Sequence, residues 1–201
     1  INSQVLVFEK KLKKKDIICD TNYFENKKNY IKRKISFQFT KYQKINSKVT
    51  HSLNIFDSNI KKKIFKINPD ILHLHWINNE FISIKQIAEI GSAGIPIVWT
   101  MHDMWPYCGA EHYTFEKRFI DGYKKSNKSK ENYGIDLNKY IWNLKYSNWQ
   151  DIKMNIICPT KWQFKNVKKS KIFRYKKISS IPLGINPKKF KLVSKNYAKK
   201  K

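Results

Sequence analysis

The stretch Ile95–Tyr113, IPIVWTMHDMWPYCGAEHY, decides the fold of this 201-residue chain. Its first seven residues are apolar or β-branched on both faces, as in a buried strand of a parallel sheet. His102 and Asp103 follow directly, at the point where such a strand would end. Ligands of open α/β sheets bind beyond the carboxyl ends of the strands. The stretch therefore predicts a strand that leads into a binding or catalytic site.

Predicted strands and helices alternate on both sides of this stretch. Their apolar patterns give strands at Ser3–Phe8, Asp70–Trp76, Asn155–Pro159 and Lys177–Ile185, and helices at Leu53–Ile67, Phe81–Gly94, Leu137–Trp149 and from Thr160 onward. The strands lie too far apart for hairpins, so right-handed βαβ crossovers are expected. The fold class is therefore α/β, with a doubly wound, Rossmann-like parallel sheet.

The other segments are less regular. Residues 16–52 read as a poorly specified insertion with one helix, and residues 102–136 as a long polar loop. Thr160–Gln163 has the pattern of a capping box, in which each end residue bonds the backbone of the other. We expect one domain over residues 1–191 and a linker or tail over residues 192–201.

The chain is strongly basic. Its 42 lysine and arginine residues against 15 acidic residues give a net charge of +27. A field of this sign attracts nucleic acid, anionic lipid or phosphorylated substrates. Lysine is nevertheless spread over nearly every segment together with asparagine and isoleucine, which favours compositional drift. The basic, aromatic stretch Lys161–Lys177 fits either a helix on an anionic bilayer or a solvated helix face.

The cysteines and the apolar runs indicate the compartment. Cys19, Cys108 and Cys158 are too few for a disulfide framework and lack the C-x-x-C spacing of zinc sites. A reducing, cytoplasmic location is therefore expected. No run approaches the ~18 uncharged apolar residues of a membrane span. Neither of the common glycine-rich phosphate-binding loops occurs in the sequence.

The candidate site residues follow three predicted strand ends. They are His75 and Trp76, then His102 and Asp103, then Thr160 and Lys161. A histidine can accept or donate a hydrogen bond near pH 7, which suits a sugar hydroxyl or a phosphate. Asp103 would orient His102 or bind a hydroxyl itself. The structural alternative is that backbone groups at the strand end make the hydrogen bonds of His102.

A metal site is a second interpretation of the same edge. His73 and His75 are two residues apart and so face the same side of a strand. A zinc site needs a third protein ligand, which His102, Asp103 or His112 would supply. We rank this below a structural role for His73 and a cleft-lining role for His75, and we predict no metal.

The loop after His102 is rich in aromatic residues. Trp105 and Tyr107 could stack on a sugar ring, while Glu111 and His112 offer hydrogen bonds to hydroxyls. The structural alternative is that the two aromatic residues pin the loop to the body of the domain. Cys108 has no basic neighbours to lower its pKa, so it is not predicted to be a nucleophile.

Three motifs together resemble the N-terminal domain of family-4 glycosyltransferases. They are PDILHLHWINNEFISI, IPIVWTMHDMWPYCGAEHY and ICPTKWQFKNVKKSKIF with SSIPLGINPKKFK, and they cover roughly residues 68–191. The resemblance is greatest to the branch that builds colanic acid and other bacterial exopolysaccharides. The turn IPLGIN is similar to the family's I-P-N-G-I-D, with Leu183 and Asn186 at the two differing positions.

The resemblance implies a retaining transferase of two Rossmann-like domains. Its co-substrate is a nucleotide-sugar, its acceptor is a glycan or a lipid-linked sugar, and it has no cofactor or required metal. His102 matches the family's strand-end histidine over the transferring sugar. The family's first β-α unit and its C-terminal donor domain are not matched, so we expect turnover only from a longer chain. The expected location is the cytoplasm, and two alternatives stay open for the basic surface, which are docking on the inner face of the cytoplasmic membrane and compositional drift.

Two other function classes stay open on the sequence. One is a metal-dependent hydrolase that uses the strand-end histidines and binds zinc, manganese or iron. The other is a basic module that binds a membrane or nucleic acid through its charge, with steep salt dependence. The second leaves the clustered histidines without a purpose, and no specific nucleic-acid partner is expected.

Overall fold

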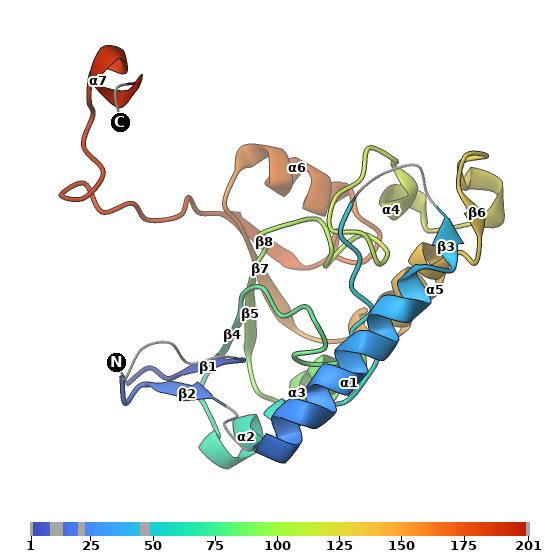
Figure 1. Cartoon of the computed structure of the whole chain (residues 1–201), viewed down its shortest axis with the longest axis horizontal. Coiled ribbons are helices and arrows are strands. Elements are labelled where there is room, and N and C mark those ends of the chain that lie inside the picture. The colour runs from blue at the N-terminus through green and yellow to red at the C-terminus, as the bar shows by residue number, and fades with distance from the viewer. Residues whose placement is uncertain (1, 9–13, 20–22, 45–48, 200–201) are drawn as a thin grey trace.

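A computed structural model describes residues 2–8, 14–19, 23–44 and 49–199 of the chain. Its centre is a parallel sheet of four strands in the order β4-β5-β7-β8 (Figure 1). The strands are β4 (Leu72–Leu74), β5 (Ile97–Thr100), β7 (Met154–Cys158) and β8 (Lys177–Ser180). The predicted α/β fold with a parallel, Rossmann-like sheet is confirmed.

A helix of at least nine residues lies between each pair of neighbouring strands. These helices are α3 (Ile84–Ser92), α5 (Leu137–Trp149) and α6 (Lys161–Lys169). Because the sheet order follows the chain order and every pair is parallel, the carboxyl ends of all four strands lie along one edge. This edge is where ligands of such sheets bind.

The core lies on one face of the sheet. Trp99 of β5 packs against Trp149 of α5, with 5.2 Å between ring centroids, and both side chains are fully buried. His73 and Asn155, which alternate with the buried residues of β4 and β7, point to the opposite face and are exposed. The helices therefore bury one face of the sheet and leave polar side chains on the other.

The start of the chain is more ordered than the sequence suggested. β1 (Val5–Val7) pairs in parallel with β2 (Ile17–Cys19), and the 18-residue helix α1 (Tyr23–Thr40) follows. β3 (Gln43–Lys44) then pairs antiparallel with β6 (Tyr133–Gly134). The predicted strand at Ser3–Phe8 and the predicted single helix are confirmed. Residues 20–22 and 45–48 of the predicted insertion lie outside the described residues.

The predicted helix at Leu53–Ile67 is wrong in its first half. Helix α2 covers only Ile60–Ile67. Asn54 has a left-handed backbone with φ 50°, and its buried side-chain amide donates to the carbonyl oxygens of Ile77 and Ile82. These long-range bonds hold the segment before α2 in an irregular path, which helical spacing alone cannot reveal.

Residues 102–136 are only partly the polar loop that the sequence predicted. The first part, from Met104 to Glu111, is buried. The second part contains the short helix α4 (Arg118–Asp121), the 3₁₀ turn η1 (Lys125–Asn127) and strand β6. The buried guanidinium of Arg118 pairs with Asp136, the N-cap residue of α5, at 2.7 Å. The segment is thus folded onto the domain.

The chain leaves the domain after β8. Residues 181–194 are exposed, and Figure 1 shows them running away from the body of the molecule toward the short helix α7 (Lys195–Lys199). The predicted boundary at residue 191 stays a prediction. Across the described residues, no helix is long and apolar enough to cross a bilayer.

Candidate functional site

Three imidazole rings form a row at the carboxyl ends of β4 and β5. The ring centroids of His73 and His75 are 4.3 Å apart, and those of His75 and His102 are 5.2 Å apart. Nδ1 of His75 lies 2.9 Å from Nε2 of His102, so one nitrogen carries the hydrogen and the other accepts it. Both side chains are exposed. The pair can therefore exchange a proton with a ligand at the rim.

The surroundings of His73 and His75 favour the neutral form of these two imidazoles. Burial, and then the neighbouring histidines, lower the pKa of His75 below its usual value. The pKa of His73 is lowered in the same way, first by burial and then by His102. His73 also lies 2.8 Å from the hydroxyl of Thr100, which fits the structural role predicted for it. The indole of Trp99 donates to the carbonyl oxygen of His75 and fixes the end of β4.

Asp103 is held by three N–H groups. Its Oδ2 accepts from the indole of Trp76 at 3.1 Å and from Nδ1 of His112 at 2.6 Å. Its Oδ1 accepts from the backbone N–H of Trp105 at 3.0 Å. The carboxylate therefore contacts Trp76 and His112 rather than His102, and the prediction that Asp103 orients His102 is wrong. The carboxylate instead fixes the exposed indole of Trp76, whose ring centroid lies 5.9 Å from that of His112.

Ser52 completes this network from the far side of His112. Its hydroxyl lies 2.8 Å from Nε2 of His112. Residues 50–52 run antiparallel to residues 110–112, with Ser52 N–H donating to the carbonyl of Ala110 at 2.9 Å. Ser52 is 4% exposed, so this Ser–His–Asp series is too buried at its serine end to present a nucleophile.

The loop after Asp103 is core rather than a binding surface. The side chains of Trp105 and Tyr107 are fully buried, and Trp105 packs on Trp99 and Trp149. The prediction that these two rings stack on a sugar is therefore contradicted, and the alternative that they pin the loop is confirmed. Burial of these large aromatic side chains stabilises the core and makes them inaccessible to a ligand. Burial also raises the pKa of the Cys108 thiol, in keeping with an inert cysteine.

Lys145 of α5 supports the loop from beneath. Its buried ammonium group donates to the carbonyl oxygens of Trp105, Cys108 and Gly109 within 3.2 Å, and it lies 3.6 Å from the ring centroid of Trp105. Burial lowers the pKa of Lys145 to about 7. The three donors of one lysine thus satisfy three carbonyls that the loop geometry would otherwise leave unpaired.

Glu111 is also turned inward. It is 4% exposed, and it accepts a hydrogen bond from the hydroxyl of Tyr123. Burial raises the pKa of Glu111 to about 7. The predicted contact of Glu111 with a substrate hydroxyl is therefore wrong in this structure. His112, also predicted to contact substrate, bonds Asp103 and Ser52 and acts on the site through them.

The start of α6 lies at the same edge of the sheet as the histidines, in contact with Asp103. Thr160 accepts from the backbone N–H of Gln163 at 3.1 Å, as the capping pattern predicts. The reciprocal bond does not form, because the side-chain amide of Gln163 donates to the carbonyl of Asp103 at 2.7 Å instead. Gln163 thereby ties α6 to the site loop, and this half of the predicted capping box is wrong.

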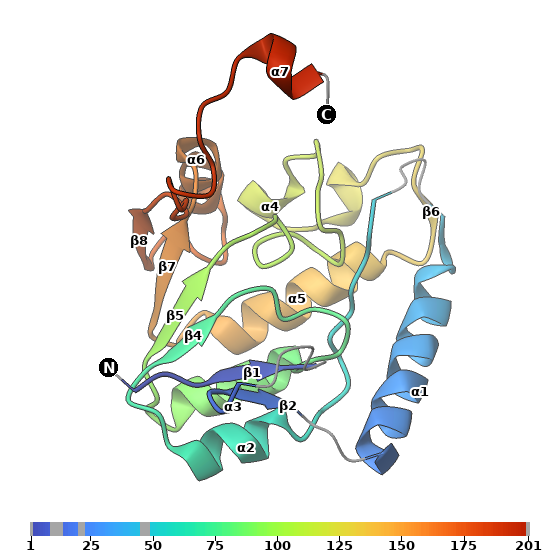
Figure 2. The ribbon, with the colours of Figure 1, turned by 60° about the vertical axis from the view of Figure 1, so that its left-hand side comes forward.

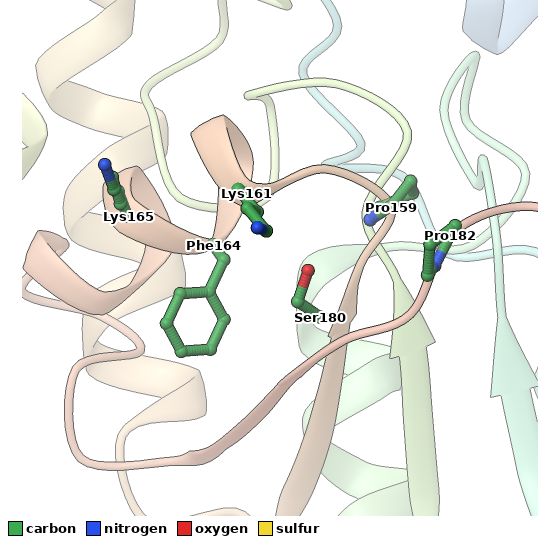
Figure 3. Close-up of a pocket in the computed structure, with 6 residues that line it drawn as sticks. All are labelled: Pro159, Lys161, Phe164, Lys165, Ser180 and Pro182. Carbon is green, nitrogen blue, oxygen red and sulfur yellow. The ribbon is translucent and has the colours of Figure 1, made fainter.

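A hollow of about 640 Å³ lies beside the start of α6. Its lining is mostly apolar, with lysines from the first turns of α6; the residues are Pro159, Lys161, Phe164, Lys165, Ser180 and Pro182. Figure 3 shows Phe164 and Ser180 on two sides of this space and the prolines at its far end. Lys161, predicted from the third strand end, is exposed at this hollow.

Exposed aromatic rings meet where the segment after His112 contacts the first turn of α6. Tyr113 stacks on Trp162 with 6.1 Å between centroids and 16° between planes, and Phe115 packs edge-on against Tyr113. The three side chains are 43%, 51% and 90% exposed, respectively, for Tyr113, Trp162 and Phe115. They provide the accessible aromatic surface that the sequence assigned to Trp105 and Tyr107.

Several residues of the site were missed from the sequence. Ser52 contacts the site from a distant segment and carries no local signal, and the capping pattern of Gln163 gives no sign of its bond to Asp103. Lys145 could have been found, because it lies on the buried stripe of α5 four residues from both Ile141 and Trp149. Among the described residues, no group of three histidine, cysteine, aspartate or glutamate side chains is arranged to hold a metal ion.

Comparison with known proteins gives one match. The family model described as Glycosyltransferase Family 4 matches residues 41–189. No curated protein and no solved structure gives a significant match to the chain. The matched residues include all four strands of the parallel sheet and every site residue described above.

Proposed function

The chain belongs to glycosyltransferase family 4, and from this premise we propose a specific reaction for it. A sugar passes from a nucleotide-sugar donor to a glycan or lipid-linked acceptor, with retention of anomeric configuration, in bacterial surface-polysaccharide synthesis. The family supports a sugar donor and an acceptor in general terms. The nucleotide carrier, the retention and the pathway are our proposal, and so is the absence of a cofactor.

The observation that carries the proposal is the exposed His75–His102 pair at the ends of neighbouring strands. During transfer, the bond from C1 of the sugar to the leaving phosphate breaks, and the phosphate takes the electron pair. The acceptor oxygen bonds to C1, and its proton passes to the leaving phosphate. Positive charge grows on the sugar ring, so fixed polar groups at the rim lower the barrier. In our proposal His102 contacts the sugar or acceptor hydroxyl, and His75 completes its hydrogen bonding.

Trp76 supplies an apolar surface next to this pair. Its indole is 48% exposed, and Asp103 fixes the ring through its N–H. The C–H face of a sugar ring packs well on such a surface, while the hydroxyls remain free to bond His102. We therefore assign Trp76 to sugar binding and Asp103 to positioning of Trp76. His112 supports Asp103 in the same role.

The start of α6 provides positive charge at the same edge. Lys161 and Lys165 line the hollow beside the site, and Thr160 caps the helix that carries them. Ammonium groups next to apolar walls suit the phosphate of a substrate whose other end is apolar. We propose that Lys161 contacts a phosphate group of the donor or of a lipid-linked acceptor. A cytoplasmic location of this chemistry also stays a prediction.

Saturation-transfer NMR tests the proposed sugar site with this chain and a panel of methyl glycosides. The unmodified protein is expected to saturate at least one glycoside, and Trp76→Ala and His102→Ala are expected to abolish the effect. Trp162→Ala is the matched control, because the indole of Trp162 is as exposed as that of Trp76, at 51% against 48%, but stacks on Tyr113 and does not bond Asp103. Binding that depends on Trp162 but not on Trp76 or His102 would contradict the proposed site.

A further inference from the structure

Helix α1 packs with its polar side against the domain. Among the side chains of α1 that the structure describes, those of Asn29 and Ser36 are buried, at 5% and 7% exposure. The hydroxyl of Ser36 donates to the buried carboxylate of Glu80 at 2.8 Å, and Lys32 bonds the carbonyl of Asp57. Polar contacts therefore fix which side of α1 faces inward.

The side of α1 that faces away from the domain is apolar. Ile31, Ile35 and Phe39 recur every four residues and are 49%, 42% and 45% exposed. Tyr30 and Phe37, seven residues apart, form a second row at 51% and 63% exposure. We call these five side chains the outer face of α1. Surface helices of globular proteins normally turn such residues inward, so this face is the reverse of the usual pattern.

Lysines accompany the outer face. Lys27 and Lys34 lie between its two rows at helical spacing, and Lys28 lies beside Ile35. All three are exposed, and the ammonium of Lys34 lies 4.8 Å from the ring centroid of Tyr30. The single acidic residue of α1, Glu25, lies three residues before Lys28 and about 120° from Ile31 on the helical projection. The face therefore combines apolar side chains with a net positive charge, from three lysines against one glutamate.

The charge decides which partner fits this face. A second copy of the chain would bring the lysine rows of two helices together within two molecules of net charge +27 each. An anionic bilayer accepts apolar side chains at its interface while its phosphates attract the lysines. Figures 1 and 2 place α1 along the outer edge of the molecule, where a flat surface can reach it.

We propose that the outer face of α1 docks this protein on an anionic phospholipid surface, with Ile31, Ile35 and Phe39 at the depth of the acyl boundary. The docking lies in α1 rather than in the basic stretch Lys161–Lys177. In that stretch Val167, Ile172 and Phe173 are buried in the core, and the two exposed rings, Trp162 and Tyr175, belong to separate elements, α6 and the turn before β8. Helix α1 ends at Thr40, just before the family-matched residues 41–189, so the docking does not depend on the proposed transfer reaction.

Co-sedimentation with vesicles tests the docking on the whole chain. The vesicles contain phosphatidylglycerol and phosphatidylcholine, or phosphatidylcholine alone. The unmodified protein is expected to sediment with the anionic vesicles only. The triple substitution I31S/I35S/F39S is expected to lower its partition coefficient by about tenfold or more, and K27E/K28E/K34E to do the same at low salt. Circular dichroism checks that both variants keep their helix content.

The matched control is F65S/I71S/I135S, which removes one Phe and two Ile that are 41%, 59% and 55% exposed elsewhere. It is expected to bind the anionic vesicles as the unmodified protein does. Equal binding by the control and the outer-face variant would overturn the proposal, as would the absence of anionic-vesicle binding. A dimer seen by sedimentation velocity and abolished by I31S/I35S/F39S would also overturn it, in favour of a second copy.

Discussion

Asp103→Asn is the substitution that most sharply separates positioning from direct contact with substrate. The carboxylate accepts three N–H groups, two at Oδ2 and one at Oδ1. An asparagine has only one side-chain oxygen, and its amide N–H₂ cannot accept. With the oxygen in the Oδ1 position, Trp76 loses its acceptor. With the oxygen in the Oδ2 position, the backbone N–H of Trp105 loses its acceptor.

The size of the effect follows from these bonds. A hydrogen bond to a charged group contributes about 1.5–3 kcal/mol, and the Asp103 side chain is 20% exposed, so water compensates part of the loss. We expect Asp103→Asn to lower the free energy of unfolding by about 1–2 kcal/mol. Affinity for a sugar that packs on Trp76 should fall with it, because the freed indole loses its fixed orientation.

Urea unfolding followed by tryptophan fluorescence measures the stability, and saturation-transfer NMR measures the sugar binding. The control is Asp70→Asn, an exposed acid whose loss should change the stability by less than about 0.5 kcal/mol. Two results would refute the reasoning. One is unfolding of Asp103→Asn at the stability of the unmodified protein. The other is loss of sugar binding with no loss of stability, which would mean direct contact of Asp103 with substrate.

Two further substitutions test the buried support of the site loop. In Gly109→Ala the new Cβ would lie 2.6 Å from backbone atoms of Asn138. This overpacking should lower the free energy of unfolding, measured in urea, by about 1–3 kcal/mol. The control Gly184→Ala, whose new Cβ would have no atom within 4 Å, should leave it unchanged. Glu111 has its pKa raised from 4.5 to about 7, so the folded state holds a proton that the unfolded state releases. Below pH 4.5 the protonated carboxyl makes its full contribution to the free energy of unfolding. This contribution, up to about 3 kcal/mol, is lost as the pH rises from 4.5 to about 7. Unfolding of Glu111→Gln should lack this decline, and an identical pH profile in both proteins would contradict the raised pKa.

The central sheet could be predicted from the sequence because its signals are local. The strands β4, β5 and β7 are short and mostly apolar, and a polar residue follows each of them within two positions. Ser83 and Thr160 cap their helices through bonds that span only three residues. The position of His75 and His102 at one rim follows from parallel pairing alone, once the strands are placed.

The parts that could not be predicted depend on contacts between distant residues. Asn54 is drawn out of a helical pattern by Ile77, Ile82 and Glu80. Ser52 reaches His112 across 60 residues. The orientation of α1 is set by the bond from Ser36 to Glu80, so its apolar residues face outward against their pattern. From the sequence, Trp105 and Tyr107 are predicted to form a binding surface. Aromatic residues next to polar ones are typical of binding sites and also of loops that are anchored in a core, so the pattern does not separate the two.

Acceptor-dependent release of nucleoside diphosphate tests the central claim most directly. The full-length protein that contains these residues is compared with its His102→Ala variant on a panel of nucleotide-sugars with a lipid-linked glycan acceptor. His102 is exposed, so its removal should leave the stability unchanged and lower kcat on the order of 10²-fold. Turnover of His102→Ala at the rate of the unmodified protein would contradict the account.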